Sequence, residues 1–154
     1  MKSRVLLALL PLLACGGGGA DVEPKSGVWL YNESELVDNN CGDSVPMYPD
    51  GDFTLTVSGA QFTVETPTET FTCSYDGGAF SCPERVVTEY TVGDTKATLK
   101  ATIDGDLDSS TDLSGVQSAT VDCTGSACGI AMTMLSISQF PCAYSISFTA
   151  SARP

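Results

Sequence analysis

The segment 71–82, FTCSYDGGAFSC, predicts a tight β-hairpin. The two glycines at its centre suit a two-residue turn, because such turns need positive φ angles that glycine adopts without strain. A turn at these glycines places Tyr75 opposite Phe80 and Cys73 opposite Cys82. Both pairs then fall at non-hydrogen-bonded positions, where facing side chains approach most closely. We therefore expect a cross-strand disulfide between Cys73 and Cys82.

A second hairpin is expected just before this segment. A two-residue loop at Ser58-Gly59 pairs Leu55 with Phe62 and Phe53 with Val64. Every residue on that face is then apolar, while threonines occupy the other face. Because a strand alternates its side chains between two faces, this agreement indicates a half-buried hairpin.

Three further turns are expected after the central segment. A loop at Gly93-Asp94 sets Tyr90 against Ala97. The segment 104–106, Asp-Gly-Asp, is typical of a turn that reverses the next strand, and the segment 113–116 has the composition of another turn. The pattern thus continues as sequential hairpins.

Near the C-terminus the pattern changes once and then returns to β. The segment 125–135 fits both a short helix and a strand, and we expect one short helix near 126–136. Alternation from Tyr144 to Ala150 then predicts a closing strand. The fold class is all-β, a single antiparallel up-and-down barrel of about eight to ten strands, which leaves no open sheet edge. A two-sheet sandwich is the alternative, although it needs longer connections.

The N-terminal residues lie outside this pattern. Lys2 and Arg4 precede an apolar run that is too short to span a bilayer, which takes roughly 20 residues. We therefore expect a signal peptide over residues 1–14. Residues 15–26 are rich in glycine and are expected to form a flexible tether, which leaves 27–154 as the barrel domain.

The end of the apolar run, Leu12-Leu13-Ala14-Cys15, resembles the lipobox of bacterial lipoproteins. The resemblance implies cleavage before Cys15, a diacylglyceryl group on its thiol and acylation of the new amine. Two or more acyl chains on one residue anchor a protein stably to a lipid bilayer. The expected location is the cell envelope, with the outer membrane as the default because Gly16 rather than Asp follows the cysteine. An ordinary secretory signal with a chance cysteine is the alternative.

Removal of Cys15 from the cysteine count leaves six of the seven cysteines for the domain. An even count in an exported chain indicates three disulfides. Beside the hairpin pair, Cys123–Cys128 closes a short loop, and Cys41–Cys142 then ties the first strand region to the last. Only the hairpin pair follows from register; the other connectivity stays open. The chain has no histidine and no cysteine pair with zinc-ribbon spacing, which argues against a metal site.

Gly27-Val28-Trp29 opens the first strand and contains the only tryptophan of the chain. A Gly-x-Trp at this place resembles the lipocalins and their calycin relatives. The resemblance implies that Trp29 closes one end of the barrel and that an arginine after the last strand, here Arg153, packs across its ring. It also implies a barrel that takes up a small apolar ligand.

Composition excludes several classes of function. Without histidine, Ser-His-Asp and Cys-His catalysis are excluded, and the scattered glutamates present no acid–base pair, so we expect no enzyme activity and no cofactor. The net charge of −12 argues against binding nucleic acid, which needs a basic patch. The bilayer, reached through acyl chains, is the expected partner.

One acidic run has carboxylates at alternate positions, as a calcium loop does: Asp104, Asp106, Asp108 and Asp112. Ser109 stands where such a loop needs glycine, and the segment is expected to be a hairpin. A polar turn is therefore the better interpretation, as it is for a second acidic run around Cys41.

Two functions remain open for the anchored barrel: binding of a small apolar ligand, or a structural or protein-interaction surface with a filled core. The barrel interior discriminates between them, because a ligand cavity needs a few hundred Å³ lined by apolar side chains. Several aromatic residues are expected on the inner faces and would fill much of it: Phe53, Phe62, Tyr75, Phe80, Tyr90 and Phe148. The sequence does not indicate an oligomeric state.

Overall fold

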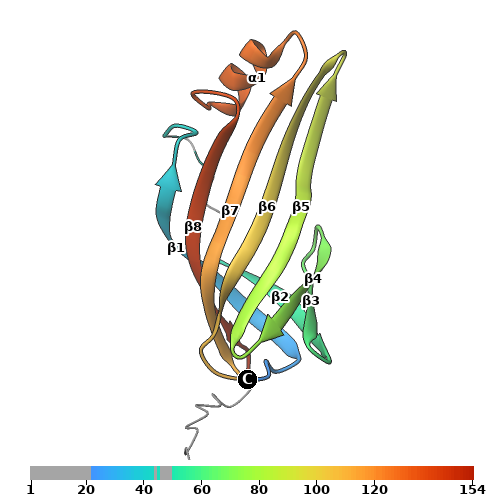
Figure 1. Ribbon diagram of the computed structural model, residues 1–154, viewed down its shortest axis with the longest axis vertical. Coiled ribbons are helices and arrows are strands. Elements are labelled where there is room, and N and C mark those ends of the chain that lie inside the picture. Colours follow the sequence, from blue (N-terminus) through green and yellow to red (C-terminus); the bar gives the residue numbers. More distant parts are fainter. Residues whose placement is uncertain (1–21, 44, 46–49) are drawn as a thin grey trace, which may run out of the picture.

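The computed structural model describes residues 22–43, 45 and 50–154. Within these residues the chain forms antiparallel strands and one short helix (Figure 1). In chain order the elements are β1 (Gly27–Asn39), β2 (Gly51–Ser58), β3 (Gln61–Glu65), β4 (Thr70–Asp76), β5 (Ala79–Val92), β6 (Thr95–Leu107), β7 (Asp112–Thr124), α1 (Cys128–Leu135) and β8 (Cys142–Ala152).

Each strand pairs with its neighbour in the sequence, and β8 pairs with β1, so the sheet closes into an eight-stranded barrel. This confirms the all-β up-and-down barrel and excludes the sandwich. Helix α1 lies inside the segment 126–136 where a short helix is expected.

The strands differ in length, and this difference shapes the molecule. β2, β3 and β4 have 8, 5 and 7 residues, whereas β5, β6 and β7 have 14, 13 and 13. The barrel is therefore closed at one end only. Beyond it, β5 to β8 and the second part of β1 continue as an open sheet with α1 at its tip (Figure 1). We call the closed part the barrel half and the extension the distal half.

The barrel half is filled by its own side chains. Apolar residues at alternate positions of each strand point inward, and the largest of them are fully or almost fully buried: Trp29, Leu55, Phe62, Phe80 and Phe148. The ring of Phe62 meets that of Phe80 edge-on at 5.6 Å. Aromatic rings so arranged leave little space inside an eight-stranded barrel.

Residues 22–26 close the end of the barrel half, although the sequence places them in the tether. Pro24 is buried, and the Trp29 indole N–H donates to the Lys25 carbonyl oxygen at 2.9 Å. The Lys25 amide donates to the Ser110 carbonyl in the loop between β6 and β7. These residues therefore belong with the barrel.

The hairpin between β2 and β3 differs from its predicted register. Ser58 pairs with Gln61 and Leu55 with Val64, so the loop is Gly59-Ala60 and not Ser58-Gly59. Gly59 has a φ of 61°, and a two-residue hairpin turn of this type requires glycine at its first central position. The predicted and the observed register place the same apolar residues on the same face of the hairpin. Burial of Leu55 is therefore compatible with both registers.

The predicted turns at 104–106 and 113–116 are wrong. β6 runs through Gly105 to Leu107, and β7 includes Leu113 to Val116, so the loop between them lies at 108–111. Gly105 and Gly115 serve close packing rather than a turn, because Gly105 faces Gly115 inside the paired strands.

Candidate functional site

The distal half has a small core of its own on one face of its sheet. Alternate residues of β6, β7 and β8 build it, and the buried members are Ala101, Ala119, Tyr144, Ile146 and the Cys41–Cys142 disulfide. The two alanines leave room on this face for the larger Tyr144 and Ile146 of β8. The disulfide fixes the chain after β1 against the start of β8, which stabilises this face.

An apolar cavity of about 160 Å³ opens beside this core. Its walls come from β5, β6, β7 and β8, from the end of α1 and from the segment after it, and they include Tyr90, Leu99, Val121, Leu135 and Ile137. Cavities that hold a drug-sized ligand measure roughly 300–1,000 Å³, whereas one of about 150 Å³ holds a benzene ring. The cavity is thus large enough for one ring-sized apolar group.

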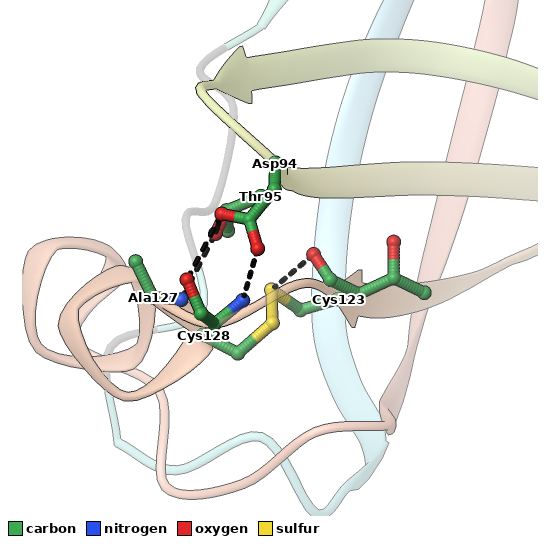
Figure 2. The surroundings of a disulfide bond; sticks show 7 residues. Asp94, Thr95, Cys123, Ala127 and Cys128 are labelled. Atoms are coloured by element: carbon green, nitrogen blue, oxygen red, sulfur yellow. Dashed lines mark hydrogen bonds between the residues drawn. A yellow bond between two sulfur atoms is a disulfide. The ribbon is translucent and has the colours of Figure 1, made fainter.

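A clasp of hydrogen bonds holds the tip of the distal half (Figure 2). The Asp94 carboxylate accepts hydrogen bonds from the Ser126 hydroxyl at 2.9 Å and from the Ser126 amide at 3.2 Å. The buried Thr95 hydroxyl accepts from the Ala127 amide at 2.9 Å. The Cys123–Cys128 disulfide closes the same loop, so the β5–β6 turn and the start of α1 are fixed together.

These hydrogen bonds also favour the charged form of the Asp94 side chain. The Ser126 hydroxyl and then the Ser126 amide lower the pKa of Asp94 below its ordinary value. The carboxylate is therefore the form that holds the loop at neutral pH. Gly125 has a φ of 108°, and a Cβ there would overlap the Asp94-Thr95 backbone, so the loop approaches the turn as closely as glycine allows.

A polar layer separates the barrel core from the distal face. Arg85 binds Glu69 in a two-pronged ion pair with N–O distances of 2.9 and 3.0 Å. Its guanidinium carbon lies 3.9 Å from the centre of the Phe71 ring. Its Nη1 is buried without a hydrogen-bond partner within the part of the chain that the structure describes.

Burial and the nearby Glu33 carboxylate raise the pKa of Tyr31, so this hydroxyl stays protonated.

Most of the exposed large apolar side chains lie on the distal half. Of the large apolar residues exposed among the described ones, all but Val28 lie there: Leu36, Val37, Val86, Val87, Tyr90, Val92, Ile130, Met134 and Leu135. Tyr90 is 61% exposed, so the expectation that it helps to fill the barrel is wrong. So many exposed apolar side chains at one end of a domain favour an interaction site there.

The six cysteines of the domain form three disulfides; Cys73–Cys82 confirms the pairing predicted from register, and the other two pairings were left open by the sequence. The disulfides join Cys73 to Cys82, Cys123 to Cys128 and Cys41 to Cys142. Cys15 and the expected signal peptide lie outside the described residues, so the expected lipidation site is not placed by the structure.

The contact expected at the closed end of the barrel is made differently. The Arg153 guanidinium binds the Asp52 carboxylate at 2.8 Å, and the ring packed beside Trp29 is that of Phe53, 6.3 Å away between centres. Trp29 itself is fully buried, in the position that seals the barrel end. Arg153 is half exposed, and its ion pair with Asp52, rather than packing on the Trp29 ring, holds it in place.

The acidic runs are held as turns and strand residues. Asp104 and Asp106 lie in β6, and Asp112 accepts hydrogen bonds from the hydroxyls of Ser109 and Thr111, which lower its pKa. In residues 22–43, 45 and 50–154, no group of three or more Asp, Glu or Cys side chains lies close enough together to hold a metal ion.

Sequence reasoning missed the distal half as a separate surface. In the run Val86-Val87-Thr88-Glu89-Tyr90-Thr91-Val92, apolar residues dominate one alternate set of positions, as they do in a half-buried strand, so the local pattern gave no sign of the exposure of Tyr90 and Val92. Arg85 was also missed; a lone arginine between Cys82 and this run carries no motif that foretells an ion pair with Glu69.

The fold and this surface define a class of protein: a closed, disulfide-bonded antiparallel barrel that carries an open apolar sheet at one end. No family model, curated protein or solved structure matches the chain. Among the described residues, no helix has the length and apolar character needed to cross a membrane.

Proposed function

We propose that this chain is a lipid-anchored display domain. Acyl chains on Cys15 hold it on the outer membrane of the cell envelope, and the distal half makes contact with other protein surfaces. The observation that carries the proposal is that all but one of the exposed large apolar side chains among the described residues lie on the distal half, because exposed apolar surface commonly marks a site of contact with a partner.

The position of the ends supports this arrangement. Residues 22–26 close the barrel half, and α1 lies at the opposite end of the molecule (Figure 1). A tether that leads from Cys15 to residue 22 reaches the molecule at the barrel end. The distal half then points away from the membrane, where partners are accessible.

The filled barrel favours a contact surface over a ligand carrier. The interior that a lipocalin-like barrel uses for ligand is occupied here by Phe62, Phe80, Phe148 and their neighbours. The distal cavity, at about 160 Å³, matches a single protein side chain better than a lipid. Protein interfaces commonly centre on one aromatic or aliphatic side chain in such a pocket.

Cell fractionation tests the anchor. The unmodified chain and a Gly19→Ser variant, whose change lies in the tether, should partition with membranes and carry acyl chains by intact mass. Cys15→Ser should move the folded, oxidised domain to the soluble fraction, because the strongly acidic surface offers no electrostatic substitute for the acyl chains. Full membrane retention of Cys15→Ser would contradict the anchor.

Site-specific photo-crosslinking in cells tests the contact surface. A photoreactive side chain at Tyr90, in the distal half, should yield covalent protein adducts. The same group at the exposed Thr56 of β2, in the barrel half, is the matched control and should yield none. Equal labelling at both positions, or none at Tyr90, would refute the distal half as the contact surface.

The distal cavity also favours a second candidate, the binding of a ring-sized apolar molecule. Its walls are almost wholly apolar, and Leu99 lies within them. Native mass spectrometry of protein purified from its own cells should then show an extra mass that Leu99→Trp, which fills the cavity, removes. A spectrum of the unmodified chain without any extra mass would refute this candidate.

A further inference from the structure

The outer edge of β5 is an unpaired sheet edge in the distal half. β4 pairs only with Ala79 to Ser81 of β5, whereas β6 pairs with β5 as far as Val92. Among the described residues, the segment 84–92 therefore has a strand on one side only. Figure 1 shows this part of β5 at the border of the sheet, beyond the end of β4.

The turn determines which backbone groups point out of this edge. The loop between β5 and β6 is Gly93-Asp94, so Val92 and Thr95 flank a two-residue turn and form a hydrogen-bonded pair. Because hydrogen-bonded and non-hydrogen-bonded pairs alternate, Tyr90 also bonds to β6. The N–H and C=O groups of Glu89 and Thr91 consequently point away from β6, toward the open side.

From Thr88 to Val92 this edge has neither a bulge nor a proline. Natural sheet edges are blocked by bulges, proline or charges. The other edge of the distal half, in β1, follows that rule: its register shifts twice beyond Glu33, and the Glu35 amide donates to the Ser147 hydroxyl. β5 also has two register shifts, between Cys82 and Arg85 and between Val86 and Thr88. Beyond them the register is regular from Thr88 to Val92, and Val92 is 58% exposed.

The charge around this edge is balanced. Residues 84–100 contain three acidic and three basic residues, in a chain whose net charge is −12: Glu84, Glu89, Asp94, Arg85, Lys96 and Lys100. Two of the pairs are ion pairs, Lys96–Glu89 at 2.7 Å and Lys100–Glu84 at 3.0 Å. Two copies of so acidic a chain repel one another in general, but not at this neutral segment.

We propose that a second copy of this chain pairs antiparallel with β5, about a two-fold axis at Tyr90. The inference rests on the proposed function, since it names the partner of the distal half. In this register Glu89 faces Thr91 of the second copy, and their outward N–H and C=O groups form four hydrogen bonds across the axis. Tyr90 faces Tyr90, and Thr88 faces Val92, at non-hydrogen-bonded positions.

The side-chain pairs in this register are favourable. No like charges face each other, because Glu89 lies opposite Thr91. The Tyr90 pair joins two aromatic rings, a combination that stabilises antiparallel strands. Tyr90 also lines the distal cavity, so pairing extends the apolar surface of one copy into that of the other.

The antiparallel arrangement has a consequence for the anchored protein. β5 runs along the long axis of the molecule, so the two barrel halves leave the dimer in opposite directions (Figure 1). With the tether at the barrel half, the two anchors lie at the two far ends. The dimer then joins copies that stand on two facing membrane surfaces.

Cysteine crosslinking tests the register. The full chain carrying Cys15→Ser is prepared with Thr88→Cys, Val92→Cys or Tyr90→Cys added. The native Cys73–Cys82 bridge occupies a cross-strand position of the same kind, with Cα atoms 4.1 Å apart, so these positions suit a disulfide. Tyr90→Cys should form a covalent dimer by itself. Thr88→Cys and Val92→Cys should form one only when the two variants are mixed with each other.

The control is Ile130→Cys on α1, which is 64% exposed and lies away from the edge. It should remain monomeric on a non-reducing gel under the same oxidation. Dimers of Thr88→Cys alone, or no dimer in the mixture, would overturn the proposed register. Equal dimer formation by Ile130→Cys would show random collision and would also overturn it.

Sedimentation without crosslinking tests the association itself. Tyr90→Lys brings two ammonium groups together at the axis and should weaken the dimer at least about tenfold, whereas Ile130→Lys should not. A strictly monomeric unmodified chain overturns the second-copy inference. The proposed contact surface would still stand if the photoreactive group at Tyr90, and not the one at Thr56, captured a different protein. It would fall if the group at Tyr90 captured none.

Discussion

Gly105 and Gly115 face each other across β6 and β7, and the rings of Phe80 and Phe148 lie against them. A Cβ on Gly105 would overlap the Ser114 carbonyl oxygen and come within 2.8 Å of the Phe80 ring. A Cβ on Gly115 would lie 3.0 Å from the Phe148 ring. The absence of side chains on β6 and β7 at this level is what lets two aromatic rings fill the barrel.

Replacing one of these glycines should therefore destabilise the fold. Gly105→Ala forces the backbone of β7 or the Phe80 ring to move, and we expect a loss of about 2–3 kcal/mol in the free energy of unfolding, measured by urea denaturation. Gly129→Ala in α1 is the control, because a Cβ there meets nothing within 4 Å. It should leave stability unchanged or raise it slightly. Equal effects of the two changes would contradict this account of Gly105.

The disulfides should differ in their contribution to stability. Cys41–Cys142 joins residues 101 apart, whereas Cys123–Cys128 joins residues 5 apart. In the loop-entropy model, removal of the long bridge by paired serine substitutions costs about 4–5 kcal/mol and removal of the short one about 2 kcal/mol. Thermal unfolding of the two double variants shows which disulfide contributes more to stability. If removing the short bridge proved the more destabilising, loop entropy would not explain their effects.

The ion pair in the polar layer should matter more than those on the surface. Glu69→Gln leaves the largely buried Arg85 guanidinium without its counter-charge, and we expect a loss of about 2 kcal/mol. Glu84→Gln removes the exposed partner of Lys100 and should cost less than about 1 kcal/mol. Denaturant titrations of both variants make the comparison. A similar loss in both would mean that burial adds nothing to the Arg85–Glu69 pair.

The clasp at Asp94 should open in acid. Hydrogen bonds from the Ser126 hydroxyl and amide lower the pKa of Asp94 below its ordinary value of 3.8. A group whose pKa is lower in the folded state stabilises that state above its ordinary pKa, and the stabilisation is lost as the pH falls through the lowered value. The Ser126 amide signal in NMR spectra should therefore shift as the pH drops below about 4. In Asp94→Asn, which cannot titrate, the shift should be absent; its persistence would assign the change to another group.

Local sequence patterns predicted the hairpin at Gly77-Gly78 with its Cys73–Cys82 bridge, because the turn fixes the register of residues a few positions apart. They failed at Gly105 and Gly115, since a glycine in a strand and a glycine in a turn have the same local signature. The burial that distinguishes them comes from Phe80 and Phe148, which approach from β5 and β8. Only the assembled barrel brings those rings to the glycines.

Tyr90, on the distal half, also shows what the local sequence predicted and what it did not. Tyr90 was correctly paired with Ala97 from the sequence, yet its predicted place inside the barrel was wrong. Its exposure depends on β4, which begins only at Thr70 and pairs with only three residues of β5. No residue near Tyr90 carries that information.

By itself, the sequence determined the all-β class, the alternating apolar faces, the resemblance of the segment around Cys15 to a lipobox and the cross-strand cysteine pair. These depend on neighbours within one hairpin or one short N-terminal segment. The tertiary structure alone decided that the barrel closes at one end, that its interior is filled and that β5 ends in an open edge. Those features depend on strand lengths compared around a closed sheet, and so on contacts between residues that are distant in the chain.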